Sequence, residues 1–257
     1  MIFESHAHYD DRAFDEDRDV LLARMQESGI EYVVNVSSSM ASVHRTLDLM
    51  EQYPFVYGAL GIHPSDIAEL DENGLEWIRQ KFSHPKAVAV GEIGLDYYWD
   101  KDEIVRARQR EWFARQLELA RELDKPVIIH SRDAAKDTYD VLSSCGGSSI
   151  RSVVHCFSYT KETALAYLKW DYYFGIGGVV TFNNAKKLKE AVQCIPLERI
   201  LLETDCPYLA PVPFRGKRNS SLNLPYVAEE IARIKGTDAE TVIEVTNRNA
   251  RTFFGLE

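Results

Sequence analysis

The feature that most constrains the fold is a regular alternation of short apolar runs with longer amphipathic segments along nearly the whole chain. The short runs are rich in β-branched residues, as buried strands are, and the longer segments carry apolar residues at helical spacing. Two helices are predicted near residues 15–28, ending at Gly29, and near 102–124, ending before Pro126. Eight strands are predicted, and they end near residues 8, 36, 63, 92, 130, 155, 177 and 205.

Eight strand–helix units in a chain of 257 residues favour an α/β fold of the (β/α)8 or TIM-barrel type. No low-complexity linker interrupts the pattern, so we expect a single domain over residues 1–257. A doubly wound open sheet is the alternative, because the number of strands is hard to count from a sequence. No glycine-rich dinucleotide or phosphate-binding loop follows any predicted strand, which weakens that alternative.

The charge balance limits the kind of partner. The 40 acidic and 30 basic residues give a formal net charge of −10. Such a chain lacks the broad basic face that holds long nucleic acid. A phosphate-bearing substrate therefore needs local positive charge, from metal ions or from a few clustered Arg and Lys side chains.

Cysteine usage and hydropathy predict a cytoplasmic protein without a membrane association. The N-terminus lacks the basic and apolar regions of a leader peptide, and no apolar run approaches the length of a membrane span. No dimerisation stripe or obligate protein partner is evident, so a monomer is expected. The four cysteines form no C-x-x-C pair and resemble reduced thiols: Cys145, Cys156, Cys194 and Cys206.

Polar residues stand where the predicted strands end. In a barrel of this type, active sites lie at the C-terminal ends of the strands. His6 and His8 follow the first apolar run, and residues two apart on a strand point to the same face. Five of the seven histidines occupy such ends. The later strands contribute the remaining candidates: His63, Glu92, His130, His155, Glu203 and Asp205.

If the fold is a barrel, six of these side chains converge on one rim and can hold two divalent ions. Mixed imidazole and carboxylate ligation suits Zn²⁺, Mn²⁺ or Fe²⁺ better than Ca²⁺. Two ions can activate a water near neutral pH and clamp the oxygens of a phosphoryl displacement. We predict Asp205 as ligand and general base, and Glu92 as the shared ligand. The predicted metal ligands are His6, His8, Glu92, His130, His155 and Asp205.

Weaker signals concern the substrate. The cluster Arg215–Arg218 is the tightest basic group, and Arg132 lies two residues beyond His130. Arg215, Lys217, Arg218 and Arg132 are predicted to bind phosphate, although a solvated loop explains the cluster equally well. Glu203 is a further candidate for substrate contact. The aromatic run Tyr97–Trp99 either stacks a base or packs a loop.

The motifs together resemble one known family. Over essentially the whole chain, the sequence is similar to the TatD-type metal-dependent deoxyribonucleases, a branch of the amidohydrolase-like hydrolase barrels. Motifs of this length and order are specific for the family, though not for its substrate. The motifs are "HAHYDD", "ALGIHP", "VGEIGLDYYWD", "PVIIHSRDA", "VVHCFS", "GIGGVVTFNNAKK", "LLETDCPYLAPVPFRGKRN" and "TNRNARTFF".

The resemblance implies a (β/α)8 barrel with two divalent ions, Mg²⁺, Mn²⁺ or Zn²⁺. It implies a phosphodiesterase that uses a metal-activated hydroxide on DNA ends or short single-stranded DNA, and that works from an end. It places His63 close to a bound phosphate, where this residue either contacts substrate or helps to hold a further metal ion. The first ion would be held by His6, His8, Glu92 and Asp205. The second would be held by Glu92, His130 and His155.

The sequence departs from the family pattern at three places. Glu4 stands where the family often has aspartate, Tyr159 replaces a glycine, and Ser220–Ser221 replaces Glu-Pro. The last two lie on expected active-face loops and leave the substrate open. One alternative is therefore a metal-dependent ester or amide hydrolase, such as a D-aminoacyl-tRNA deacylase. Another is a metal-binding barrel that acts as a scaffold without catalysis.

Overall fold

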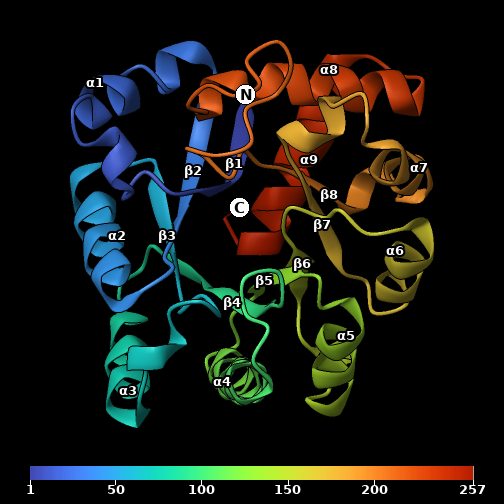
Figure 1. The fold of residues 1–257 in the computed structure, drawn as a ribbon. Helices are drawn as coiled ribbons and strands as arrows, with labels where there is room; N and C mark the ends of the chain where they lie inside the picture. Colours follow the sequence, from blue (N-terminus) through green and yellow to red (C-terminus); the bar gives the residue numbers. More distant parts are fainter. Residues whose placement is uncertain (257) are drawn as a thin grey trace. The chain divides into compact units, whose positions relative to one another are not determined.

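The computed structural model describes residues 1–256, and all eight strands in this range belong to one sheet, in the order β1 to β8. The strand pairs for which a register is defined are all parallel. Figure 1 shows the strands with the helices between them. Their bounds are β1 (Ile2–Ala7), β2 (Ile30–Val36), β3 (Val56–Leu60), β4 (Ala87–Asp96), β5 (Val127–Arg132), β6 (Ser152–Val154), β7 (Tyr173–Ile176) and β8 (Ile200–Leu202).

The first and last strands of the sheet also meet. Ala7 forms a parallel bridge with Cys206, just beyond β8. The N–H of His8 donates to the carbonyl of Cys206 at 2.9 Å, and the N–H of Asp205 donates to the carbonyl of His6 at 3.0 Å. A sheet whose two edges pair with each other is a barrel, so the predicted (β/α)8 fold is confirmed and the open-sheet alternative is wrong.

Nine α-helices occur in residues 1–256, and a polar side chain begins several of them. Ser39, Asp71, Asp102 and Asp238 each accept a hydrogen bond from a backbone N–H of the first turn, as good N-caps do. The helices are α1 (Arg18–Ala23), α2 (Met40–Gln52), α3 (Glu72–Lys81), α4 (Glu103–Glu122), α5 (Ala135–Ser144), α6 (Lys161–Leu168), α7 (Lys186–Cys194), α8 (Leu224–Lys235) and α9 (Ala239–Phe254).

Residues 1–256 also contain seven short 3₁₀ helices. One of them replaces the end of the α-helix that was predicted near residues 15–28. The helix expected over 15–28 is only the short α1, followed by a 3₁₀ turn that ends at Gly29 in the left-handed conformation (φ 84°). Glycine reaches that conformation at no steric cost, so the predicted end is right although the helix is broken. The 3₁₀ helices are η1 (Arg12–Phe14), η2 (Gln26–Ser28), η3 (Ile67–Glu69), η4 (Gly147–Ser149), η5 (Gly178–Thr181), η6 (Leu197–Arg199) and η7 (Ser221–Asn223).

The chain divides into two compact units, which we describe separately. The terminal unit comprises Met1–Asn35 and the residues from Cys156 onward, and the central unit comprises Val36–His155. That residues 1–257 form one domain stays a prediction. Among the described residues, no helix combines the length and the apolar character needed to cross a membrane.

In the terminal unit, the last helix covers the first strand. Helix α9 packs against β1 and β8, and Figure 1 shows its red ribbon beside the blue β1. The ring of Phe254 stacks on that of Phe3, with 5.6 Å between centroids and 7° between planes. Phe253 meets Tyr173 of β7 edge to face at 5.2 Å. The two ends of the chain therefore share one core.

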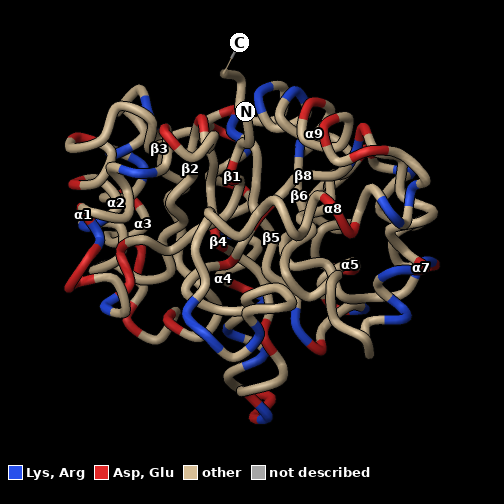
Figure 2. Tube along the Cα trace, turned by 90° about the horizontal axis from the view of Figure 1, so that it is seen from above, with Lys and Arg blue, Asp and Glu red and all other residues tan. Residues whose placement is uncertain are grey.

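In the central unit, an apolar cluster joins α2, α3 and α4 to β3 and β4, with Leu60, Ile78 and Trp112 among its members. The outer face of α4 is charged, and Figure 2 shows its basic and acidic residues interspersed. Arg115 of this helix pairs with Glu72 and Glu118. Acidic neighbours therefore offset the charge of this arginine.

Candidate metal centre

In the terminal unit, the structure brings together three of the predicted ligands. The Nε2 atoms of His6 and His8 lie 3.1 Å apart. Asp205 Oδ1 lies 3.3 Å from Nε2 of His8 and 3.7 Å from Nε2 of His6. Two imidazole nitrogens and one carboxylate oxygen thus form a first ligand group. His6 is buried, whereas the His8 and Asp205 side chains are partly exposed.

The backbone after β8 directs Asp205 toward these histidines. Asp205 adopts a left-handed conformation (φ 57°), which is uncommon for a residue other than glycine. Its N–H donates to His6 at 3.0 Å, and its carbonyl accepts from the N–H of Tyr208 at 2.9 Å. These two backbone bonds hold the turn on which the carboxylate is presented.

Glu4, one of the three departures from the family pattern, accepts hydrogen bonds from the backbone that carries this group. Its side chain is fully buried, and its Oε1 accepts from the N–H groups of Thr204 at 2.9 Å and His6 at 3.2 Å. Its Oε2 accepts from the hydroxyls of Thr204 at 2.6 Å and Ser221 at 2.8 Å. Burial raises the pKa of Glu4 to about 7, although these hydrogen bonds oppose the shift.

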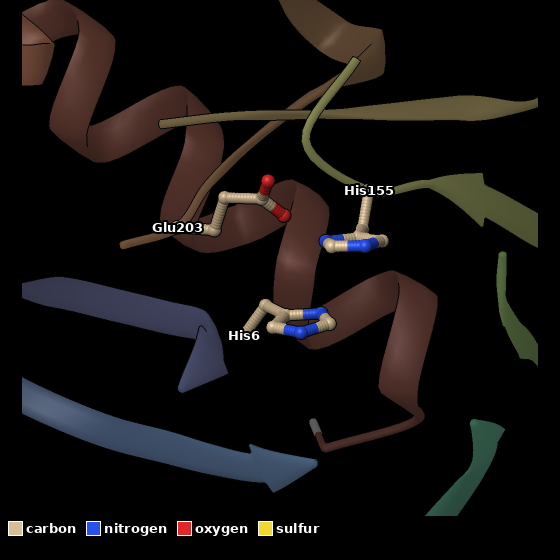
Figure 3. A group of neighbouring side chains, drawn as sticks. All are labelled: His6, His155 and Glu203. Atoms are coloured by element: carbon tan, nitrogen blue, oxygen red, sulfur yellow. The ribbon is translucent and has the colours of Figure 1, made fainter. Parts of the chain in front are cut away.

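Glu203 follows β8 directly and is buried, and its role as a substrate contact stays a prediction. Its Oε1 accepts from the N–H of Cys156 at 2.5 Å. A Cβ at Gly175 would lie 2.0 Å from Glu203 Oε2, so the Glu203 carboxylate occupies the space of a side chain at position 175. A Glu203 oxygen lies within 4.8 Å of a His6 ring nitrogen, and Figure 3 shows both side chains. His155, drawn in the same figure, belongs to the central unit.

In the central unit, three predicted histidines surround one oxygen of a fourth predicted site residue, Glu92. Glu92 Oε1 lies 2.6 Å from Nδ1 of His130 and 2.6 Å from Nε2 of His155. Those two nitrogens are 3.2 Å apart. His63 Nε2 lies 3.9 Å from the same Glu92 oxygen, and its ring meets that of His130 edge to face at 4.3 Å. This is the second ligand group.

The charges in the second group are strongly coupled. Burial opposes ionisation of Glu92, but the positive charge of His155 and His130 outweighs it and holds the pKa of Glu92 well below its usual range. Burial also opposes the charged form of His130, yet Glu92 and Asp96 raise the pKa of His130 to about 9. Burial and the neighbouring His130 lower the pKa of His63 to about 3, so this imidazole stays neutral.

Asp96 is a site residue that the sequence analysis missed. Its Oδ2 lies 3.1 Å from Nε2 of His130, whose other ring nitrogen faces Glu92. A carboxylate behind a ligand histidine fixes the orientation and the tautomer of the ring. The signal was present: Glu92 and Asp96 lie four residues apart in one strand, and a period of two predicts the same face.

Two buried glutamines of α4 hold the strand ends that carry this group. Gln116 accepts from the N–H of Ile62 at 2.8 Å and donates to its carbonyl at 3.0 Å, directly before His63. Gln109 makes the corresponding pair with Asp96, at 3.0 and 3.2 Å. Each amide satisfies a backbone donor and acceptor that would otherwise be buried without partners.

The predicted phosphate contacts fall into two kinds. Arg218 is already neutralised, because its guanidinium binds both carboxylate oxygens of Asp17, at 2.8 and 2.5 Å. Arg132, Arg215 and Lys217 are exposed, and within residues 1–256 no carboxylate lies at ion-pair distance from them. The Arg132 guanidinium lies 3.9 Å from the centroid of the Tyr98 ring, and the Arg215 guanidinium lies 4.3 Å from that of Phe182.

Both groups carry the donor types that bind a divalent ion, and the first also has the spacing of a metal site. Ligand bonds of about 2.1 Å in a tetrahedral site place neighbouring donor atoms roughly 3.4 Å apart. In the first group the donors are 3.1 to 3.7 Å apart, which agrees with such a site. In the second group the two imidazole nitrogens are 3.2 Å apart, but the Glu92 oxygen lies 2.6 Å from each of them, at hydrogen-bond distance. Imidazole with carboxylate is the donor set of Zn²⁺, Mn²⁺ and Fe²⁺ sites.

A (β/α)8 barrel with such groups at its strand ends has the architecture of the metal-dependent hydrolases. Residues 3–255 match the model of one family within this class, described as TatD related DNase. The chain belongs to this family and is a metal-dependent hydrolase.

Individual relatives agree with this assignment. The chain is 41% identical to the uncharacterized metal-dependent hydrolase YabD of Bacillus subtilis, over the full length of both. It is 32% identical to the 3′-5′ ssDNA/RNA exonuclease TatD of Shigella flexneri, over 95% of each chain. The crystal structure of YjjV, a TatD homolog from Escherichia coli, superposes with a TM-score of 0.92 at 29% identity, over 100% of this chain and 98% of the other.

Proposed function

We propose that this hydrolase is a nuclease that removes nucleotides from the 3′ end of single-stranded DNA or RNA. The observation that carries the proposal is Arg132, an exposed guanidinium without a carboxylate partner in residues 1–256, two residues beyond His130 on the same strand. In a chain of net charge −10, such a cation beside a ligand group is suited to a phosphate. A relative named as a 3′-5′ ssDNA/RNA exonuclease supports the choice of substrate and polarity.

We further propose that two divalent ions, Mg²⁺, Mn²⁺ or Zn²⁺, serve the reaction. The first would be held by His6, His8 and Asp205, and the second by Glu92 with its two histidines. That Glu92 also reaches the first ion stays a prediction from the family resemblance. When bound, such ions lower the pKa of a water and offset the negative charge that develops on the phosphate.

Three side chains would then transfer the proton and bind the substrate. The carboxylate of Asp205 is partly exposed and takes the proton of the attacking water. The guanidinium of Arg132 holds a non-bridging phosphate oxygen with its N–H groups. His63 stays neutral because its pKa is lowered, and it donates one hydrogen bond to a substrate oxygen.

The test is cleavage of short single-stranded DNA and RNA, labelled at either end, by metal-stripped protein with one divalent ion restored at a time. We expect a ladder that shortens from the 3′ end. Asp205→Asn should lower kcat by about 10²- to 10⁴-fold, the usual contribution of a general base. Asp171→Asn is the matched control, because Asp171 is an exposed carboxylate paired with Arg199.

Intact oligonucleotides under every metal would overturn the nuclease proposal. Ester substrates, including a D-aminoacyl-tRNA, would then be tried with the same variants. Hydrolysis that Asp205→Asn abolishes would assign ester chemistry to these residues. Metal binding without hydrolysis of any substrate would point to the scaffold alternative. The predictions of a monomer and of a cytoplasmic location are independent of these outcomes.

A further inference from the structure

The aromatic run after β4 divides into a buried and an exposed part. Tyr97 is buried, and its hydroxyl bonds Asp137 at 2.8 Å and Arg110 at 3.0 Å. Tyr98 and Trp99 are 45% and 68% exposed. Their rings meet edge to face, with 4.7 Å between centroids and 86° between planes. Tyr97 therefore packs the loop, while the next two rings face water.

The loop that carries these rings is held at several points. Asp96 Oδ1 accepts from the N–H groups of Tyr98 at 2.9 Å and Trp99 at 3.2 Å. The Lys101 ammonium donates to the Tyr97 carbonyl at 2.7 Å, and Arg106 Nε donates to the Asp100 carbonyl at 2.9 Å. The rings are thus exposed on a fixed backbone, and a ligand that covers them orders little further chain.

Arg132 completes the group. Its guanidinium lies 3.9 Å from the centroid of Tyr98 and 5.6 Å from that of Trp99. Residue 132 pairs with Asp96 in the register of β4 and β5. As stated above, no carboxylate within residues 1–256 neutralises this cation. We call Tyr98, Trp99 and Arg132 the aromatic–arginine platform.

One carboxylate connects the platform to the second ligand group. Asp96 holds the backbone of Tyr98 and Trp99 with Oδ1, and holds Nε2 of His130 with Oδ2. A ligand on the platform therefore lies close to the residue that orients His130. The platform offers two chemistries at once, the exposed aromatic face of Trp99 and an unneutralised forked cation.

We propose that the platform is a nucleotide subsite, which stacks a nucleobase on the exposed ring of Trp99 and binds the adjoining phosphate through Arg132, with Tyr98 holding both side chains. The inference rests on the proposed nuclease function and specifies its substrate recognition. Every base has a π face, so stacking tolerates any sequence. A strand paired in a duplex keeps its bases stacked on one another, so the platform selects unpaired ends.

Binding measurements in EDTA test the platform without cleavage. The probes are a fluorescein-labelled single-stranded oligonucleotide and the same strand with abasic residues at its 3′ end. We expect Trp99→Ala to weaken binding of the intact strand about ten-fold, as loss of a base-stacking ring does, and to leave binding of the abasic strand unchanged. Arg132→Ala should weaken both strands equally and lower the salt dependence by about one phosphate contact.

Two control variants match these changes. Ile104→Ala removes an 81% exposed apolar side chain beyond the same loop. Lys81→Ala removes a cation that lies over the Trp77 ring at 4.7 Å, away from the ligand groups. Both should bind like the wild type. Trp99→Phe should retain the affinity and lose the quenching of tryptophan fluorescence that the base causes.

The outcomes separate this inference from the nuclease proposal. Suppose that the wild type cleaves and that Trp99→Ala binds the strand as tightly as the wild type does. The platform is then overturned and the nuclease proposal stands. Cleavage by a wild type that does not prefer the intact strand to the abasic strand has the same meaning. Absent cleavage together with the predicted binding pattern would overturn the nuclease proposal and retain the platform as a nucleotide site. No binding of either strand by the wild type would overturn the platform.

Discussion

The two ligand groups use the same side-chain types but are held in different ways. In the terminal unit, Glu4 supports His6 through hydrogen bonds from neutral donors, and burial raises the pKa of Glu4 to about 7. In the central unit, Glu92 lies 2.6 Å from two imidazoles whose charge holds its pKa well below the usual range. One group depends on a hydrogen-bonded shape and the other on opposed charges.

Because of this difference, loss of the glutamate should have different consequences in the two groups, on fold stability in one and on metal affinity in the other. Loss of a buried hydrogen-bond acceptor leaves donors unsatisfied and destabilises the fold. Loss of the Glu92 charge leaves the buried imidazoles of His130 and His155 without this counter-charge and removes the charge that attracts a cation. The four variants below test this contrast.

Glu92→Gln should have the largest effect. The amide keeps the shape of the carboxylate and removes its charge, so metal affinity in the central unit should fall beyond the ~10- to 100-fold that loss of an outer partner causes. Hydrolysis should become undetectable. Zinc competition and activity assays measure both, and near wild-type zinc affinity would show that charge does not organise this group.

Glu4→Ala should affect stability first. It leaves the donors of Thr204, Ser221 and His6 without their acceptor, at about 1–3 kcal/mol for each buried group left unsatisfied. Urea unfolding of the metal-free protein measures the loss. Glu4→Gln is the matched control and should cost less, because its amide oxygen still accepts. Equal stability of both variants and the wild type would contradict a role for hydrogen bonding here.

Asp96→Asn should have an intermediate effect. It removes the charge behind His130 while its amide oxygen can still cap the loop at Tyr98. Metal affinity should fall about 10- to 100-fold, with little change in unfolding free energy. Asp137→Asn is the control, because that carboxylate bonds Tyr97 and Arg110 and contacts no ligand histidine.

Glu230→Gln should have the smallest effect and supplies a surface reference for the charge argument. Hydrogen bonds from Arg233 and Lys189 lower the pKa of Glu230 from 4.5 to about 2. Its stabilisation is therefore complete above about pH 4.5 and disappears as the pH falls through about 2. Since solvent screens this pair, we expect less than about 1 kcal/mol at pH 7. The free energy of unfolding, measured at pH 7 and at pH 3, should differ less between variant and wild type at pH 3.

The fold was predictable because each strand ends in a recognisable change from apolar to polar residues, as at His6 and Glu203. Asp96 was missed because the fourth strand was expected to end near residue 92, whereas β4 continues to Asp96. The hydrogen bond between Ser221 and Glu4 joins two departures from the family pattern that lie 217 residues apart. No local pattern reports such a contact, because only the closed sheet creates it.

The pairing of β1 with the segment after β8 also sets an order of events during synthesis. The first strand leaves the ribosome at once, but its partners Thr204, Cys206 and Phe254 come at the other end of the chain. At about 5–20 residues per second, translation of the 197 residues from His8 to Asp205 takes roughly ten to forty seconds. During that time His6 and His8 lack Asp205, so a nascent chain, or one truncated before residue 205, cannot complete the first ligand group.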